Sequence, residues 1–275
     1  MKKLLLLPVF VLLTLVTIST SYANVLIEDV NSTQDTDTNG GLFSGVIDTG
    51  SGAPGDYELI TCGIFAEGPN PFNAPSPGSW NEIANETCFP NTCQLGIWGR
   101  FTDSSSSEDV TCSWNNSSSA FAAGSFRYNN VDKDNPIIDS ACSEFDIPSQ
   151  MYVTPPVQFE AGSQLVQILL LTGNNNGDMA AALSVDPFSE GFTETVLQGP
   201  GLGLSGGSTF QETAGVFEFP PFPRIGDTIG IKFCFLSLRM APKVIPTMSE
   251  WGLIATAGVL GIISFFALRR RKAAA

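Results

Sequence analysis

Short β-prone runs recur along the chain between clusters of Gly, Pro, Asn and Ser. One of them, Thr228–Phe235, alternates polar or small residues with apolar ones, which is typical of a strand with one buried face. No long stretch between the two ends of the chain has helical periodicity. Many short strands joined by turns predict an all-β domain of the β-sandwich or jelly-roll type. The expected strands are Tyr57–Ala66, Gln94–Phe101, Val110–Trp114, Ala120–Tyr128, Met151–Phe159, Gln164–Leu171, Ala180–Val185, Phe192–Leu197, Val216–Phe219 and Thr228–Leu238.

The amino-terminal end is an apolar run, Leu4–Ile18, that follows two lysines and leads into small residues ending at Ala23. This order is typical of a secretory signal peptide cleaved by signal peptidase. An uncleaved anchor helix is the alternative, although the run is short for a membrane span. We therefore expect residues 1–23 to be removed and the exported chain to begin at Asn24.

The carboxyl-terminal end carries a second apolar segment, Leu253–Leu268, without a charged residue. As a helix rising ~1.5 Å per residue it covers about 24 Å, which is adequate for a thin or locally thinned bilayer. The basic stop that follows is Arg269, Arg270, Arg271 and Lys272. The positive-inside rule places residues 269–275 in the cytoplasm. One transmembrane helix at 253–268 would then hold the body of the chain, residues 24–244, outside the cytoplasmic membrane.

An ordered motif stands directly before this helix: Ile245, Pro246, Thr247, Met248, Ser249, Glu250, Trp251 and Gly252. Together with the helix and the basic stop, it resembles the IPTLxxWG-type carboxyl-terminal sorting signal, with Met248 at a position where that motif usually has Leu. Proteins with such tails resemble substrates of exosortases, membrane transpeptidase-like enzymes of Gram-negative bacteria. The resemblance implies that the tail is cut near the motif and the body passed to the cell surface. An ordinary single-pass anchor is the alternative, and the resemblance does not extend to residues 24–244.

All six cysteines lie in the body: Cys62, Cys88, Cys93, Cys112, Cys142 and Cys234. An even number in an exported chain indicates three disulfides, whose connectivity the sequence leaves open. Since five of the six lie at or before residue 142, Cys234 must reach back to an early strand, which favours one unit over two. A cysteine-bound metal cluster is the alternative.

The charge and the missing histidine exclude several functions. The body has 26 acidic and 7 basic residues, a net charge of −19, which argues against nucleic-acid binding and is suited to divalent cations. Because the chain contains no histidine, Ser-His-Asp triads, His-bound metals and imidazole acid–base catalysis are excluded. The Gly-rich residues 201–207 match dinucleotide and hydrolase motifs by letters only, so we interpret them as a flexible turn. No catalytic residue is assigned.

The sequence suggests one cofactor, calcium. Asp35, Asp37 and Asn39 alternate ahead of Gly40 as in the first half of an EF-hand-type loop. The twelfth position is Val46 rather than a bidentate Glu, and no helices flank the loop. An acidic linker after the signal peptide is the other interpretation.

Three tryptophans, Trp80, Trp98 and Trp114, lie in the cysteine-rich segment among polar residues. Aromatic faces beside polar groups suit carbohydrate, whereas large aromatics more often pack in a core, and we favour the core. Acidic clusters that a glycosidase could use are more typical of solvated loops. These clusters are Asp132, Asp134 and Asp139, and Asp103, Glu108 and Asp109.

These features predict a non-enzymatic bacterial surface protein, a structural or adhesive component of the envelope or extracellular matrix. It would be anchored in the inner membrane by its carboxyl-terminal helix, then processed and left at the cell surface or outside the cell. The expected partners are signal peptidase, an exosortase-type enzyme, the cytoplasmic membrane for a time, and a surface polysaccharide, but no nucleic acid. A carbohydrate-binding module and a carboxylate-dependent glycan hydrolase are the alternatives.

Overall fold

The computed structural model describes two units of the chain, one that ends at Ala241 and one within Pro242–Ala275. The described residues of the first unit are almost all in strands or the turns between them, and three disulfides join them, so the all-β, disulfide-linked prediction is confirmed. The predicted signal peptide at 1–23, the motif at 245–252 and the basic residues at 269–272 lie outside the described residues. The described residues are 26–36, 41–66, 68–88, 91–118, 120–146, 151–173, 190–196, 201–219, 221–223, 228–241, 254–255, 257–260 and 262.

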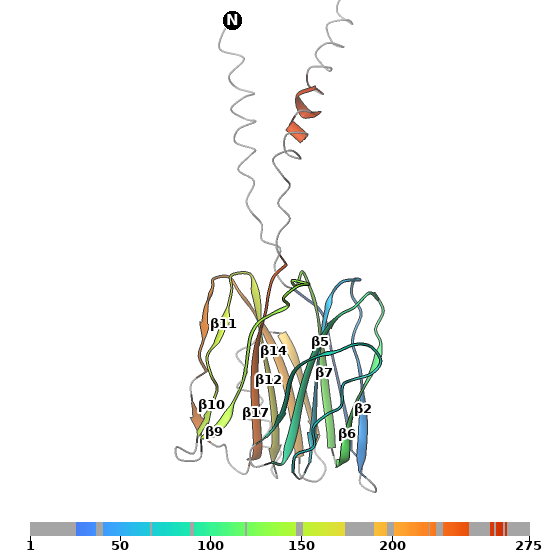
Figure 1. Cartoon of the computed structure of the whole chain (residues 1–275), viewed down its shortest axis with the longest axis vertical. Coiled ribbons are helices and arrows are strands. Elements are labelled where there is room, and N and C mark those ends of the chain that lie inside the picture. Colours follow the sequence, from blue (N-terminus) through green and yellow to red (C-terminus); the bar gives the residue numbers. More distant parts are fainter. Residues whose placement is uncertain are drawn as a thin grey trace, which may run out of the picture. The chain divides into compact units, whose positions relative to one another are not determined.

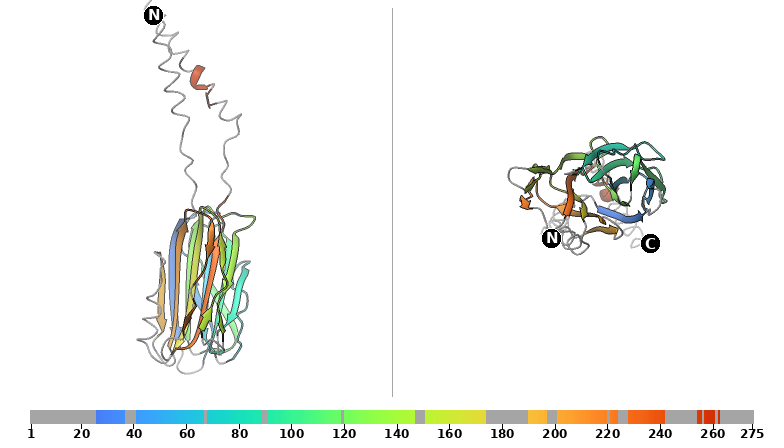
Figure 2. Two further views of the ribbon diagram at one scale, coloured as in Figure 1. Left: turned by 90° about the vertical axis from the view of Figure 1, so that its left-hand side faces the viewer. Right: turned by 90° about the horizontal axis from the view of Figure 1, so that it is seen from below.

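Two five-stranded antiparallel sheets form the centre of the first unit. Figure 2 shows their strands running along a common direction. The first sheet has the order β1-β7-β3-β5-β4, and the second has the order β13-β14-β12-β17-β8. The strands of the first sheet are β1 (Leu26–Thr36), β3 (Tyr57–Phe65), β4 (Asn81–Thr87), β5 (Cys93–Phe101) and β7 (Ala120–Asn129). Those of the second are β8 (Ile137–Cys142), β12 (Ser163–Gly173), β13 (Glu190–Val196), β14 (Gly201–Gln211) and β17 (Thr228–Leu238).

Smaller sheets cover the outer faces of the two large ones (Figure 1). A two-stranded sheet lies on the first: β2 (Leu42–Asp48) and β6 (Asp109–Ser118). A three-stranded and a two-stranded sheet lie on the second: β9 (Glu144–Asp146), β10 (Met151–Val153) and β16 (Phe222–Pro223), then β11 (Val157–Phe159) and β15 (Gly215–Phe217). The predicted strand Met151–Phe159 is thus two strands, β10 and β11. Pro155 and Pro156 separate them and have no N–H to donate to a ladder.

Three hydrophobic cores result from this layering. The inner core lies between the large sheets, where Phe126 of the first meets Ile168 and Leu236 of the second. The sheets approach so closely that a Cβ on Gly63 would lie 2.4 Å from a methyl carbon of Leu170. Two outer cores lie beneath the smaller sheets. Both faces of the inner strands β3, β5, β7 and β12 are therefore buried.

Burial on both faces corrects the prediction for the last strand. Alternation in Thr228–Phe235 predicted one buried face, but every residue from Ile231 to Leu238 is buried. Phe233 and Phe235 face an outer core, and Cys234 and Leu236 face the inner core. The alternation in this sequence therefore reflects two different buried environments, the inner core and an outer core, and not one buried and one solvent-exposed face.

The prediction of a flexible turn at the Gly-rich residues 201–207 is also wrong, because these residues form the first part of β14. β14 pairs along its length with β12 on one side and with β13 on the other. Ladder hydrogen bonds on both sides order a run that has little intrinsic strand propensity. The predicted strand Ala180–Val185 lies outside the described residues.

The three disulfides tie together different levels of the fold. Cys62 of β3 bonds Cys112 of β6 and so joins the first sheet to its cover. Cys88 bonds Cys93 across the turn between β4 and β5. Cys142 of β8 bonds Cys234 of β17, the residue directly opposite it in the ladder. The prediction that Cys234 reaches back to an earlier strand is confirmed.

Removing single disulfides should destabilise the protein in order of the loop that each one closes. Cys142 and Cys234 are 92 residues apart in the sequence, and their disulfide closes the loop between them. We expect the double substitution Cys142→Ala and Cys234→Ala to lower the free energy of unfolding by about 4 kcal/mol. Cys88 and Cys93 are only 5 residues apart in the sequence. The double substitution Cys88→Ala and Cys93→Ala should therefore lower the free energy of unfolding by about 2 kcal/mol. Urea unfolding followed by tryptophan fluorescence measures both, and equal losses would contradict the loop argument.

The second unit is described only in part. Its described residues at 254–255, 257–260 and 262 are helical and exposed, and they lie within the predicted helix at 253–268. Across the residues that the structure describes, no helix reaches the length and apolar character needed to cross a membrane.

Candidate functional site

A charged network crosses the first sheet near one end of its strands. Glu58 of β3 lies directly opposite Arg100 on β5 and also opposite Arg127 on β7. Glu58 and Arg127 are fully buried, with 1 % and 0 % of their side chains exposed. Asp56, directly before β3, adds a second buried carboxylate. The ladder register therefore brings both arginines and Glu58 together, and the loop before β3 adds Asp56.

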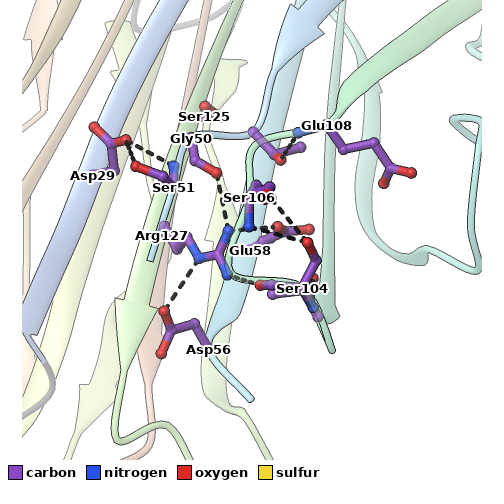
Figure 3. Close-up of polar contacts among 12 residues, drawn as sticks. Asp29, Gly50, Ser51, Asp56, Glu58, Ser104, Ser106, Glu108, Ser125 and Arg127 are labelled. Atoms are coloured by element: carbon purple, nitrogen blue, oxygen red, sulfur yellow. Dashed lines mark hydrogen bonds and ion pairs between the residues drawn. The ribbon is translucent and has the colours of Figure 1, made fainter. Parts of the chain in front are cut away.

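Arg127 uses its whole guanidinium group within the protein (Figure 3). Nε donates to Asp56 Oδ2 at 3.1 Å, and Nη1 donates to the Gly50 carbonyl at 2.9 Å and to Glu58 Oε1 at 3.4 Å. Nη2 donates to the Ala53 carbonyl at 3.1 Å and to the Ser104 carbonyl. A guanidinium group carries five N–H donors, and these five acceptors occupy them. Arg127 therefore has no donor left for a ligand.

Arg100 extends the network to the surface. Its Nε donates to Glu58 Oε2 at 2.7 Å and its Nη2 to Glu108 Oε2 at 2.5 Å. The guanidinium carbon lies 4.1 Å from the centre of the Trp80 ring, within cation–π range. Burial alone would lower the pKa of Arg100, but the hydrogen bonds to Glu108 and Glu58 outweigh it and raise the pKa. Arg100 is therefore charged at any physiological pH.

The network fixes the two loops that surround it. Gly50 and Ala53 lie in the loop between β2 and β3, and Ser104 lies in the loop between β5 and β6; all three bond Arg127 through their carbonyls. A Cβ on Gly52 would lie 2.4 Å from Asp56 Oδ2 and 2.6 Å from Arg127 Nε, so this position has room only for glycine. Arg127 and its partners therefore form a clamp, the Arg127 clamp, that holds the two loops to β7. Its hydrogen-bond donors and acceptors stabilise the fold.

The sequence analysis missed this network, although a signal was present. The body has few basic residues, and two of them, Arg100 and Arg127, stand among apolar residues inside predicted strands. A charge inside such a strand requires partners. Which carboxylates would supply them depends on strand order and register, which the sequence did not give.

Two of the three tryptophans belong to the core. Trp98 and Trp114 are 1 % and 3 % exposed, and Phe72 packs edge-on against both with ring centres 5.6 Å apart. The indole N–H of Trp114 donates to the Leu42 carbonyl at 2.9 Å. The core interpretation is confirmed for these two, and only Trp80 is half-exposed, with Arg100 against its ring. Trp98 and Trp114 are therefore too buried to contribute to a carbohydrate-binding surface.

The calcium candidates are placed only in part. Asp35 is an exposed residue of β1, opposite Phe121 of β7, so it belongs to a strand and not to a linker. Asp37 and Asn39 lie outside the described residues. In the described portion of the chain, no three acidic or cysteine side chains gather to hold a metal ion.

The acidic clusters are engaged in local contacts. Asp132 accepts a hydrogen bond from the backbone N–H of Asp134 at 2.9 Å. Asp139 accepts one from the backbone N–H of Gln158 at 2.9 Å. Glu108 pairs with Arg100. Each of these contacts is typical of a surface turn or a strand edge.

The first unit is held in place up to its last residue. Met240 bridges to Val131, and the Ala241 N–H donates to the Asn130 carbonyl at 2.7 Å. The first unit thus ends shortly before Ile245, where the motif begins.

Comparison with known proteins identifies this motif and nothing else in the chain. Residues 245–271 match the model of the IPTL-CTERM motif, which confirms the resemblance drawn from Ile245–Gly252 and the basic residues. No curated protein and no solved structure matches the chain. Residues 245–271 therefore carry an IPTL-CTERM motif, consistent with a carboxyl-terminal sorting signal.

Proposed function

We propose that this chain is an exported bacterial surface protein whose tail is processed by an exosortase-type enzyme. The match of residues 245–271 to the IPTL-CTERM motif carries this proposal. The amino-terminal segment, residues 1–23, supplies the export signal, and signal peptidase removes it. Residues 253–268 cross the inner membrane until processing, with the basic stop in the cytoplasm.

The body acts as a non-enzymatic structural or adhesive component of the envelope or extracellular matrix. Two large sheets with a shared core support a fold of the β-sandwich type, and three disulfides suit a protein that works outside the cell. The absence of histidine supports a role without acid–base or nucleophilic catalysis. Among the described residues, the most extensive charge network surrounds Arg127, and its hydrogen bonds hold loops in place.

The test is the intact mass and the cell fraction of the exported protein. We expect a species that begins at Asn24, ends within residues 245–252 and is found at the surface or in the medium. Trp251→Ala should leave Arg269–Lys272 attached and the protein in the inner membrane, whereas Trp80→Ala in the body should be processed as the unaltered chain is. An unaltered chain that keeps Arg269–Lys272 in the inner membrane would overturn the sorting proposal in favour of a permanent anchor.

A further inference from the structure

A cavity of about 160 Å³ opens between the two large sheets, at the edge formed by β4 and β8. Apolar side chains from three strands, Ile83, Ile97 and Leu236, line it together with the Cys142–Cys234 disulfide. Its polar lining comes from Glu86, Ser140, Glu144 and Lys232. A cavity of this size in another protein admits a molecule as large as benzene.

Lys232 is the unusual member of this lining. It lies on the inner face of β17, where Cys234 and Leu236 belong to the hydrophobic core, and only 6 % of it is exposed. Its Nζ lies 3.1 Å from Glu86 Oε2. An ammonium group has three donors, and a buried charge requires partners for them. Within the described part of the chain Lys232 has one ionic partner, Glu86, which leaves donors for a molecule in the cavity.

The carboxylates of the lining lie on its solvent side. The Glu86 side chain is 44 % exposed, and Glu144 is exposed as well. The cavity therefore presents the Lys232 cation directly beside the Glu86 carboxylate, 3.1 Å apart, with apolar side chains around them. Such an adjacent pair matches a small molecule whose anionic and cationic groups are separated by a single carbon atom.

We propose that this cavity binds a small zwitterionic amino compound of the size of alanine. Its carboxylate accepts hydrogen bonds from Lys232, and its ammonium group pairs with Glu86 and Glu144 at the mouth. This inference goes beyond the proposed function, because it concerns the body and is independent of how the tail is processed.

Isothermal titration of the exported protein with three probes of one shape tests the proposal. The probes are L-alanine, isobutyrate, in which a methyl group replaces the ammonium group, and alaninamide, in which an amide replaces the carboxylate. We expect saturable binding of alanine and at least ~10-fold weaker binding of the other two, because each loses a charged hydrogen bond. No saturable heat with alanine, or equal binding of all three probes, would overturn the proposal.

Lys232→Met separates binding from folding. Methionine fills a similar volume, and the Glu86 carboxylate that loses its partner is partly in water, so the melting temperature should be kept or raised. Alanine affinity should fall at least ~10-fold. Lys133→Met, which removes an exposed lysine outside the cavity, should bind alanine like the unaltered chain.

A second variant covers the case in which Lys232→Met does not fold. Glu86→Gln keeps the shape of the mouth and removes its charge, and it should weaken alanine more than isobutyrate. Unchanged alanine affinity in either folded variant would contradict the assigned site.

Discussion

Arg127→Ala is expected to lower the free energy of unfolding by about 3–5 kcal/mol. The substitution leaves Asp56, which is 5 % exposed, without an ionic partner, and leaves Glu58, which is 1 % exposed, with Arg100 alone. It also leaves the carbonyls of Gly50, Ala53 and Ser104 without the donor that holds them. An unpaired buried carboxylate costs far more than the net value of the ion pair itself. Urea unfolding followed by the fluorescence of buried Trp98 and Trp114 measures the loss.

Arg239→Ala is the matched control for this experiment. Arg239 pairs with Glu160 at 3.3 Å, but the two side chains are 30 % and 55 % exposed. Exposed ion pairs contribute about 1 kcal/mol or less, so this variant should remain close to the unaltered chain. Similar losses in the two variants would show that the clamp around Arg127 contributes no more than a surface pair. Arg127→Lys should recover little, because an ammonium group cannot reproduce the five-donor geometry.

The strands that the sequence predicts best are those with dense β-branched and aromatic residues. Tyr57–Ala66, Gln94–Phe101 and Thr228–Leu238 match β3, β5 and β17 almost residue for residue. These runs are buried on both faces in the structure, and their apolar residues mark them without help from the rest of the fold. The six cysteines likewise predicted three disulfides, and the structure shows how the cysteines pair.

What the sequence could not predict depends on pairing. β14 is ordered by its two neighbours and not by its own Gly-rich composition. β1, which contains Asp35, is polar enough to pass for a linker, yet it pairs with β7 along its length. The Arg127 clamp and the Lys232 cavity depend on which strands are adjacent and on which sheets face each other. The sorting motif is the opposite case, since it is contiguous and can be recognised from the sequence alone.

Removing β17 is expected to abolish the fold, whereas removing everything after Ala241 is expected to leave it intact. β17 lies inside the second sheet, between β12 and β8, and holds the partner of Cys142. It contributes Cys234, Leu236 and Leu238 to the inner core and Ile231, Phe233 and Phe235 to an outer core. A chain that ends at Asp227 loses both sets and leaves two ladder edges unpaired, a cost well above the 5–15 kcal/mol that stabilises a typical domain.

The comparison of these two truncated chains also tests whether the body keeps its fold without the tail that carries the sorting motif. The chain ending at Ala241 keeps the bonds from Met240 to Val131 and from Ala241 to Asn130, so it should show near-ultraviolet circular dichroism and one cooperative urea transition. The chain ending at Asp227 should show neither. Since the described residues of the first unit end at Ala241, ahead of Ile245–Gly252, we expect processing to release a body as stable as the uncut one. Loss of the cooperative transition in the chain ending at Ala241 would mean instead that the body depends on its tail.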